Sequence, residues 1–116
     1  MIEQWIAEIK KSAPAEALGM ILVHNGVVRA TTKTGAPVGG MKLSYDRAGL
    51  EQALARFRSR DGIAEIRAWI NEGDLNVGDD IMVVVVAGRF RKDIVPVFQE
   101  LITLIKTEIV REEERA

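Results

Sequence analysis

The spacing of apolar residues predicts two amphipathic helices in the first half of the chain. In residues 2–11, isoleucines recur every three or four positions between charged neighbours, and Pro14 follows them. Residues 46–60 show the same period, with Asp46 as a candidate N-cap and an Asp-Gly pair at 61–62 as the stop. Four residues at the positions i, i+3, i+4 and i+7 predict the buried face of this second helix: Leu50, Ala53, Leu54 and Phe57.

A third helix is predicted after a cluster of basic residues, Arg89, Arg91 and Lys92. Asp93 is its candidate N-cap, and Pro96 then falls in the first turn, where a missing N–H costs nothing. The helical period continues to the segment Lys106-Thr107. It predicts a buried stripe made by Ile94, Phe98, Leu101, Ile102 and Ile105.

Four segments rich in Val, Ile and Leu predict β-strands, at residues 18–29, 41–45, 63–70 and 81–87. The first is expected to bend at Asn25-Gly26, because this dipeptide favours positive φ. The last is apolar on both faces, which is typical of a central strand covered on both sides. Residues 30–40 contain three glycines, three threonines and no large apolar anchor, so they predict a mobile loop, and residues 71–80 predict a turn-rich connection.

The resulting order, α-β-β-α-β-β-α, predicts an α+β fold with two long helices on a mainly antiparallel sheet. A length of 116 residues, 47% of them hydrophobic, suits a single domain. The chain has no cysteine, which excludes disulfides, thiolate metal sites and a cysteine nucleophile. The longest apolar run has seven residues, too few to cross a bilayer, so we expect a cytoplasmic protein without a membrane partner.

Charge is distributed unevenly although the formal net charge is only -1. Residues 29–60 hold seven basic and two acidic side chains, whereas residues 108–116 hold four acidic and two basic ones. We therefore divide the chain into a slightly basic domain at 1–107 and an acidic C-terminal tail at 108–116. Because no global positive field exists, we expect no nucleic-acid partner.

Few side chains are candidates for chemistry. The only histidine, His24, lies in a predicted strand, where a lone histidine is usually structural, and no other ligands for a transition metal accompany it. Arginines beside a mobile loop or a helix start, as at Arg29 and Arg91, suit a phosphate or a carboxylate. Lys106 lies at the margin of an apolar stripe. It either extends into solvent or, if partly buried, serves as an acid, base or amine nucleophile.

Four pieces of sequence together resemble one family: GMILVHNGVVR at 19–29, LSYDRAGLEQAL at 43–54, GDLNVGDD at 73–80, and the run from Val83 through Arg91 to Lys106-Thr107. In order and spacing they are similar to the large, catalytic subunit of molybdopterin synthase, the MoaE family. The resemblance implies an α/β-hammerhead-like fold and a homodimer at the centre of a heterotetramer. It also implies a small ubiquitin-like sulfur-carrier partner ending in Gly-Gly, whose thiocarboxylate converts cyclic pyranopterin monophosphate into molybdopterin, with no bound cofactor or metal.

The same resemblance assigns roles to individual residues. Lys106 becomes the catalytic lysine, and the substrate phosphate is expected to bind basic side chains at Arg29, Lys33, Arg89 and Arg91. Two positions differ from the family pattern: Phe90 replaces the histidine of a His-Arg pair, and Glu113 falls near the second pocket lysine. These departures weaken the expected activity and leave open an alternative, a dimeric binding module of the same fold that has lost turnover.

Overall fold

The computed structural model describes all residues, 1–116. Its helices are α1 (Ile2–Ser12), α2 (Arg47–Arg58) and α3 (Arg91–Leu104), with a short 3₁₀ turn η1 (Ala15–Ala17) and a π turn η2 (Ile105–Ile109). Its strands are β1 (Met20–Val27), β2 (Gly40–Tyr45), β3 (Ile63–Ile70), β4 (Gly73–Asn76), β5 (Asp80–Gly88) and β6 (Val110–Arg115). No helix is both long enough and apolar enough to cross a membrane.

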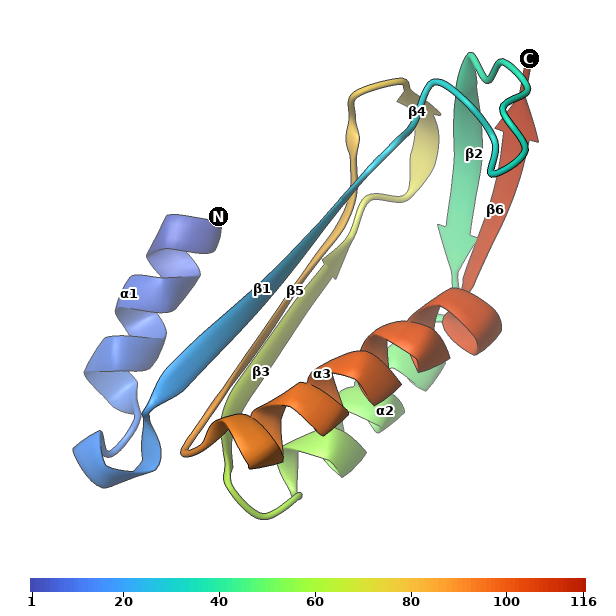
Figure 1. Cartoon of the computed structure of the whole chain (residues 1–116). Coiled ribbons are helices and arrows are strands. Elements are labelled where there is room, and N and C mark those ends of the chain that lie inside the picture. The colour runs from blue at the N-terminus through green and yellow to red at the C-terminus, as the bar shows by residue number, and fades with distance from the viewer.

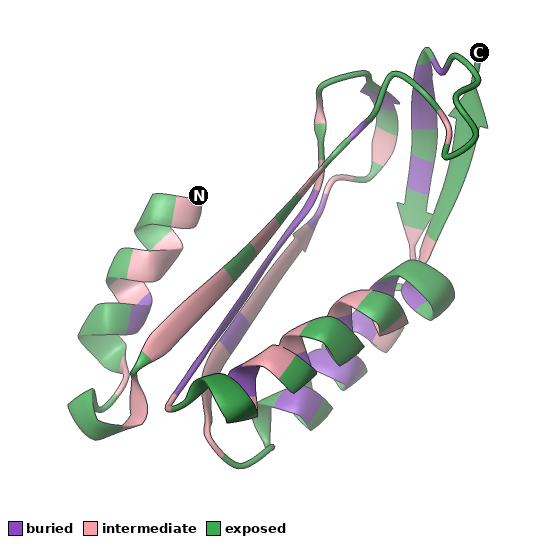
Figure 2. Cartoon of the chain, viewed as in Figure 1, coloured by how far each residue is buried: buried purple, intermediate pink, exposed green.

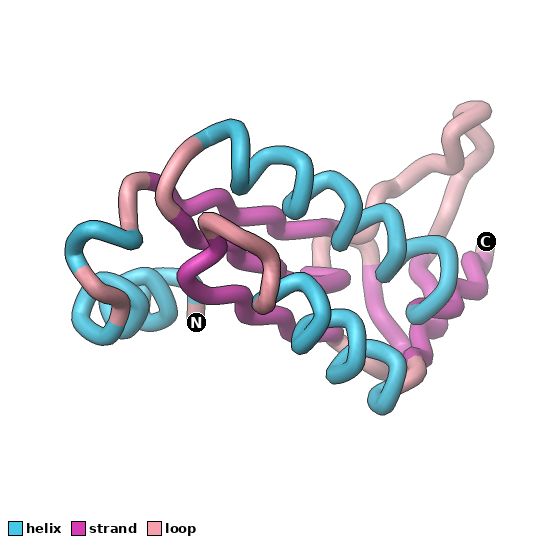
Figure 3. Tube along the Cα trace, turned by 90° about the horizontal axis from the view of Figure 1, so that it is seen from below, coloured by secondary structure: helices cyan, strands magenta, loops and turns pink.

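The larger part of the core is built on a three-stranded antiparallel sheet in the order β1-β5-β3. Helix α1 covers one face of this sheet, and α2 and α3 run side by side across the other (Figures 1 and 3). Alternate residues of β5 therefore enter two cores: Val83 and Val85 pack under α1, and Val84 and Val86 under α2 and α3. This arrangement confirms the prediction of a central strand buried on both faces, and β5 is purple in Figure 2 except at its start.

A second antiparallel sheet, in the order β4-β2-β6, lies beyond the C-terminal end of α3 (Figure 1). Its inward side chains join the main core through Met41, Leu43 and Leu75. Two of its strands are absent from the sequence-based prediction. Strand β4 lies in the segment predicted to be only a connection, and β6 lies in the acidic tail segment and pairs with β2 from Tyr45↔Val110 to Gly40↔Arg115.

Helix α2 confirms the sequence pattern. The Asp46 carboxylate caps it by accepting a hydrogen bond of 3.0 Å from the backbone N–H of Gly49. The four residues predicted to be buried are buried. The helix ends two residues earlier than predicted, at Arg58, and Gly62 then takes a φ of +82°, which an L side chain rarely adopts.

Helix α3 begins earlier than predicted, and this changes two expectations. Its N-cap is Phe90, so Asp93 lies in the first turn, 3.5 Å from the guanidinium of Arg89, and caps nothing. Pro96 is inside the helix and not in its first turn, so its position does remove a backbone hydrogen bond. The buried residues of the α3–η2 segment are Ile94, Val97, Leu101, Ile105 and Ile109, while Phe98 and Ile102 are only partly buried.

The end of β1 and the loop after it differ in detail from expectation. The pairing of β1 with β5 shifts register between Gly26 and Val27, which confirms an irregularity there, but Gly26 does not have a positive φ. A β-bridge between Thr31 and Pro37 closes the loop, and Val38 is buried. The loop therefore has an apolar anchor, and the prediction that it lacks one is wrong.

Candidate functional site

A pocket of about 570 Å³ lies where the end of β1, the loop after it, η2 and β6 come together. Its lining includes three of the predicted site residues: Arg29 and Lys33, from the segment after β1, and Lys106, which is distant from both in sequence. His24, Glu112 and Glu114 line the same pocket. A concave site with several convergent charged groups is the best candidate for ligand binding in this chain.

Lys106 reaches the pocket from the π turn that ends the α3 segment. Turns of this kind occur frequently at functional sites, because the wider turn changes the direction of the following side chains. Next to it, the Thr107 hydroxyl donates a hydrogen bond of 2.8 Å to the carbonyl of Thr103, which ties this turn to α3. Lys106 is exposed and forms no salt bridge, so its ammonium group extends into the solvent-filled pocket and is available to a ligand.

The other two basic residues of the pocket are equally uncommitted. Arg29 is exposed, and its guanidinium makes a single long contact of 3.4 Å with the Thr31 hydroxyl. Lys33 is exposed and has no acidic partner. Two uncommitted cations beside a concave surface are suited to a phosphate or carboxylate group.

Two acidic side chains of β6 line the pocket, but Glu113, the residue expected there, does not. Glu112 and Glu114 line it, while Glu113 does not, because neighbouring residues of a strand point to opposite faces. Arg115, on the same face of β6 as Glu113, contacts the Asn76 side chain at 3.1 Å, on the β4 side of the sheet. The position where the family resemblance expects a second lysine is thus flanked by two carboxylates that face the basic groups.

His24 is a pocket residue that the sequence analysis set aside as structural. It is half-buried on the face of β1 that packs on α3, with its ring edge-on to Phe98 at 6.4 Å between centroids. Burial first, and the positive charge of Lys106 second, lower the pKa of His24 below its ordinary value of 6.5. The alternation of residues in β1 could have shown that His24 shares a face with Leu22, but nothing local in the sequence places it beside Lys106.

The remaining two predicted residues lie at the far end of α3. Arg89 is engaged with Asp61 at 3.4 Å and Asp93 at 3.5 Å, and its guanidinium stacks on the Phe90 ring at 5.0 Å. Arg91 is exposed at the first position of the helix. Within one chain, therefore, the structure brings Arg29, Lys33 and Lys106 together but leaves Arg89 and Arg91 outside the pocket.

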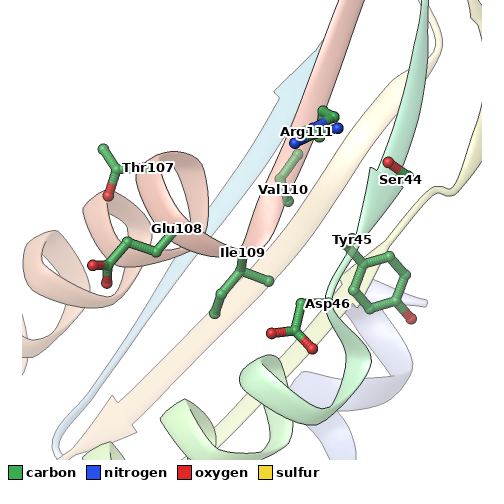
Figure 4. A pocket seen from close by; sticks show the side chains of 8 residues that line it. All are labelled: Ser44, Tyr45, Asp46, Thr107, Glu108, Ile109, Val110 and Arg111. Atoms are coloured by element: carbon green, nitrogen blue, oxygen red, sulfur yellow. The ribbon is translucent and has the colours of Figure 1, made fainter.

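A second pocket, of about 400 Å³, lies on the other side of η2, between the end of β2 and the start of β6 (Figure 4). Thr107 and Glu108 line it, whereas their neighbour Lys106 lines the larger pocket. Its Asp46 carboxylate is already used as the cap of α2. This pocket holds none of the predicted site residues.

Comparison with known proteins decides the family. A family model described as "MoaE protein" matches residues 2–108, which is nearly the whole chain. The chain belongs to the MoaE family. This family is the large, catalytic subunit of molybdopterin synthase and acts in molybdenum cofactor biosynthesis, as the sequence resemblance implied.

Solved structures of MoaE proteins share the fold of this MoaE chain. A molybdopterin synthase from Staphylococcus aureus matches with a TM-score of 0.76 and 21% identity, over 99% of this chain and 84% of that one. A molybdopterin biosynthesis MoaE protein from Burkholderia ambifaria MC40-6 matches with a TM-score of 0.80 and 21% identity, over 100% and 77%. These matches confirm the predicted α+β fold of a molybdopterin synthase large subunit.

One similar structure contains a partner. It is a protein–protein complex of subunits 1 and 2 of the molybdopterin-converting factor from Helicobacter pylori 26695, with a TM-score of 0.73, 17% identity, and coverage of 97% of this chain and 77% of that one. No curated protein sequence matches this chain.

Proposed function

We propose that this MoaE chain transfers sulfur from the C-terminal thiocarboxylate of a small ubiquitin-like protein to cyclic pyranopterin monophosphate, giving molybdopterin. For each sulfur of the dithiolene, one C–S bond forms on the pterin side chain and replaces a C–O bond, whose oxygen leaves on the phosphate or as water. The thiocarboxylate C–S bond of the partner then breaks, and water supplies the oxygen left on the partner's carboxylate. The observation that carries the proposal is the convergence of Arg29, Lys33 and Lys106 in one pocket of a MoaE fold.

The pocket supplies the groups that this reaction needs. Arg29 and Lys33 are free to bind the substrate phosphate, because neither forms a salt bridge. Lys106 supplies the amine beside the carbon that receives sulfur. The π turn positions this lysine. The sulfur arrives on the partner, which agrees with a chain that has no cysteine of its own.

Two chains are needed to complete the site. Arg91 lies about 20 Å from Lys106 along the helix, at 1.5 Å per residue, which is too far for both to hold one small substrate. In a two-fold dimer, Arg91 of one subunit can meet Lys106 of the other. The neighbouring Phe90 side chain is 53% exposed, as expected of an aromatic group that becomes covered in such an interface.

The partner is a small sulfur-carrier protein ending in Gly-Gly, and the assembly is a heterotetramer with the MoaE dimer at its centre. The complex of two subunits from Helicobacter pylori supports a small-subunit partner for this fold. We propose that the reaction takes place in the cytoplasm.

Turnover is expected to be slow. Glu112 and Glu114 present negative charge where a phosphate has to bind, and Phe90 cannot transfer a proton as a histidine would. Both features reduce the stabilisation of developing negative charge. They leave Lys106 and Arg29 in place, which is why we propose an active enzyme rather than a binding module.

The test is a reconstitution assay. The chain is mixed with a thiocarboxylated partner ending in Gly-Gly and cyclic pyranopterin monophosphate, and molybdopterin is detected by mass spectrometry. We expect product that requires both proteins. A chain that binds the partner but forms no product over many hours would instead identify the non-catalytic module.

A further inference from the structure

His24 occupies a position from which it can contact whatever the basic pocket binds. It lies on β1, two residues before the register shift, and lines the pocket together with Gly26 and Lys106. Its ring rests edge-on against Phe98 of α3, which restricts its orientation. The side chain is therefore held at the pocket wall and is not free in solvent.

One nitrogen of this ring has no partner in the protein. The Nε2 atom is buried and forms no hydrogen bond. A Cβ atom at Gly26 would lie 3.3 Å from Nε2, which is a tight contact, so a glycine at this position keeps a side chain off the nitrogen. A buried polar atom without a partner is unfavourable, and a bound ligand that hydrogen-bonds to it removes this cost.

Burial and the nearby charge of Lys106 favour the neutral form of the imidazole. Lys106, Arg29 and Lys33 line the same pocket as cations, and Glu112 and Glu114 face them from β6. Burial and Lys106 lower the pKa of His24, so the ring is neutral at pH 7. A neutral imidazole has one nitrogen that donates and one that accepts, and the orphaned Nε2 fits the acceptor.

We propose that His24 is a catalytic residue of this pocket, whose Nε2 accepts a hydrogen bond from an O–H or N–H group of the bound substrate and takes its proton. The O–H or N–H bond breaks, its electron pair stays on the substrate atom, and an Nε2–H bond forms. Lys106 and Arg29 stabilise the negative charge that develops on the substrate, and the proton returns when product forms. This inference rests on the proposed function.

Because His24 is the only histidine in the chain, its ring can be observed without interference. Nitrogen NMR of the wild-type protein at pH 7 is expected to show an unprotonated Nε2, and its resonance is expected to shift when cyclic pyranopterin monophosphate is added. Binding that leaves this resonance unchanged overturns the proposal even if no turnover occurs.

Kinetics supply the second readout. In the wild type, kcat/KM is expected to fall on the acid side as His24 becomes protonated. His24→Phe keeps the ring volume and His24→Gln keeps a hydrogen-bonding group, but neither accepts a proton, so both are expected to lose this acid limb and to lower kcat by roughly 10²-fold or more. Val23→Ala, on the opposite face of β1, is the control and is expected to match the wild type.

The outcomes separate the two proposals. No product from the wild type, with a competent partner, refutes the proposed reaction, and the NMR titration still decides whether Nε2 of His24 contacts the bound pterin. If the wild type is active and both His24 variants have its rate and its pH profile, the proposed function stands and the proton transfer by His24 is refuted. A variant with a lowered rate but an intact acid limb also counts against it, because a merely structural loss would give that result.

Discussion

Arg91 and Lys106 lie at opposite ends of the helical segment formed by α3 and η2 and cannot reach one small substrate in the same subunit. The composite site that we propose has a measurable consequence. Arg91→Ala and Lys106→Ala are each expected to be slower than the wild type by about two orders of magnitude or more as homodimers. Mixed in equal amounts and allowed to exchange, they should recover about one quarter of wild-type activity, because half of the dimers are mixed and each mixed dimer has one intact site.

Light scattering checks the premise of this experiment. A chain that stays monomeric at micromolar concentration, alone and with its partner, contradicts the shared site. A mixture that remains as slow as the two homodimers although the subunits have exchanged contradicts it as well.

The two pocket carboxylates are expected to restrain activity. Replacing Glu112 or Glu114 by Gln removes a negative charge that competes with the substrate phosphate, so KM should fall. Because both side chains are exposed, screening limits the effect to about two- to fivefold for each substitution. Glu113→Gln is the matched control, since it removes the same charge from the other face of β6. An equal effect in all three variants would show that only net charge matters.

The loop at residues 30–40 is expected to become more ordered when the pocket is filled. Its first half lines the pocket at Thr31, Thr32 and Lys33, and Val38 anchors its end, but most of its residues are exposed. Hydrogen exchange should be fast in the free protein and slower by at least several-fold with cyclic pyranopterin monophosphate. Slow exchange in the free protein would contradict this expectation.

The stability of the fold is expected to depend on pH through His24. Its pKa is lowered in the native state, so the unfolded chain binds more protons as the pH falls below 6.5. The free energy of unfolding should therefore decrease from pH 6.5 downward, until the pH lies below the native pKa of His24. Denaturation profiles of the wild type and of His24→Gln check this, because the substituted protein should lack the contribution over that window.

The sequence was sufficient where apolar residues set the structure. The period of α2 gave its buried face, and the continuous apolar run of β5 gave its central place, because burial on a helix stripe or on both faces of a strand leaves a clear pattern. The start of α3 was misplaced because Asp93 resembles a cap, whereas in the structure its carboxylate pairs with Arg89.

Patterns of apolar residues could not predict the strands that are fixed by main-chain hydrogen bonds alone. Strand β6 has the sequence VREEER with no apolar alternation, and it exists because its backbone pairs with β2. In β4 only Leu75 is buried, so no period was visible. His24 and Lys106 line the same pocket although β1 and η2 are distant in sequence, so no local pattern relates the histidine to the lysine.

The most direct test of the proposed mechanism is transfer of labelled sulfur from the thiocarboxylated partner to the pterin in a single turnover, comparing the wild type with Lys106→Ala and Lys92→Ala. Both lysines are exposed on the helical segment of α3 and η2, but only Lys106 lines the pocket. We predict that Lys106→Ala is slower than the wild type by about two orders of magnitude or more, and that Lys92→Ala, at a position beside the proposed dimer interface but outside the pocket, is affected much less. Equal rates in the wild type and Lys106→Ala would contradict the account.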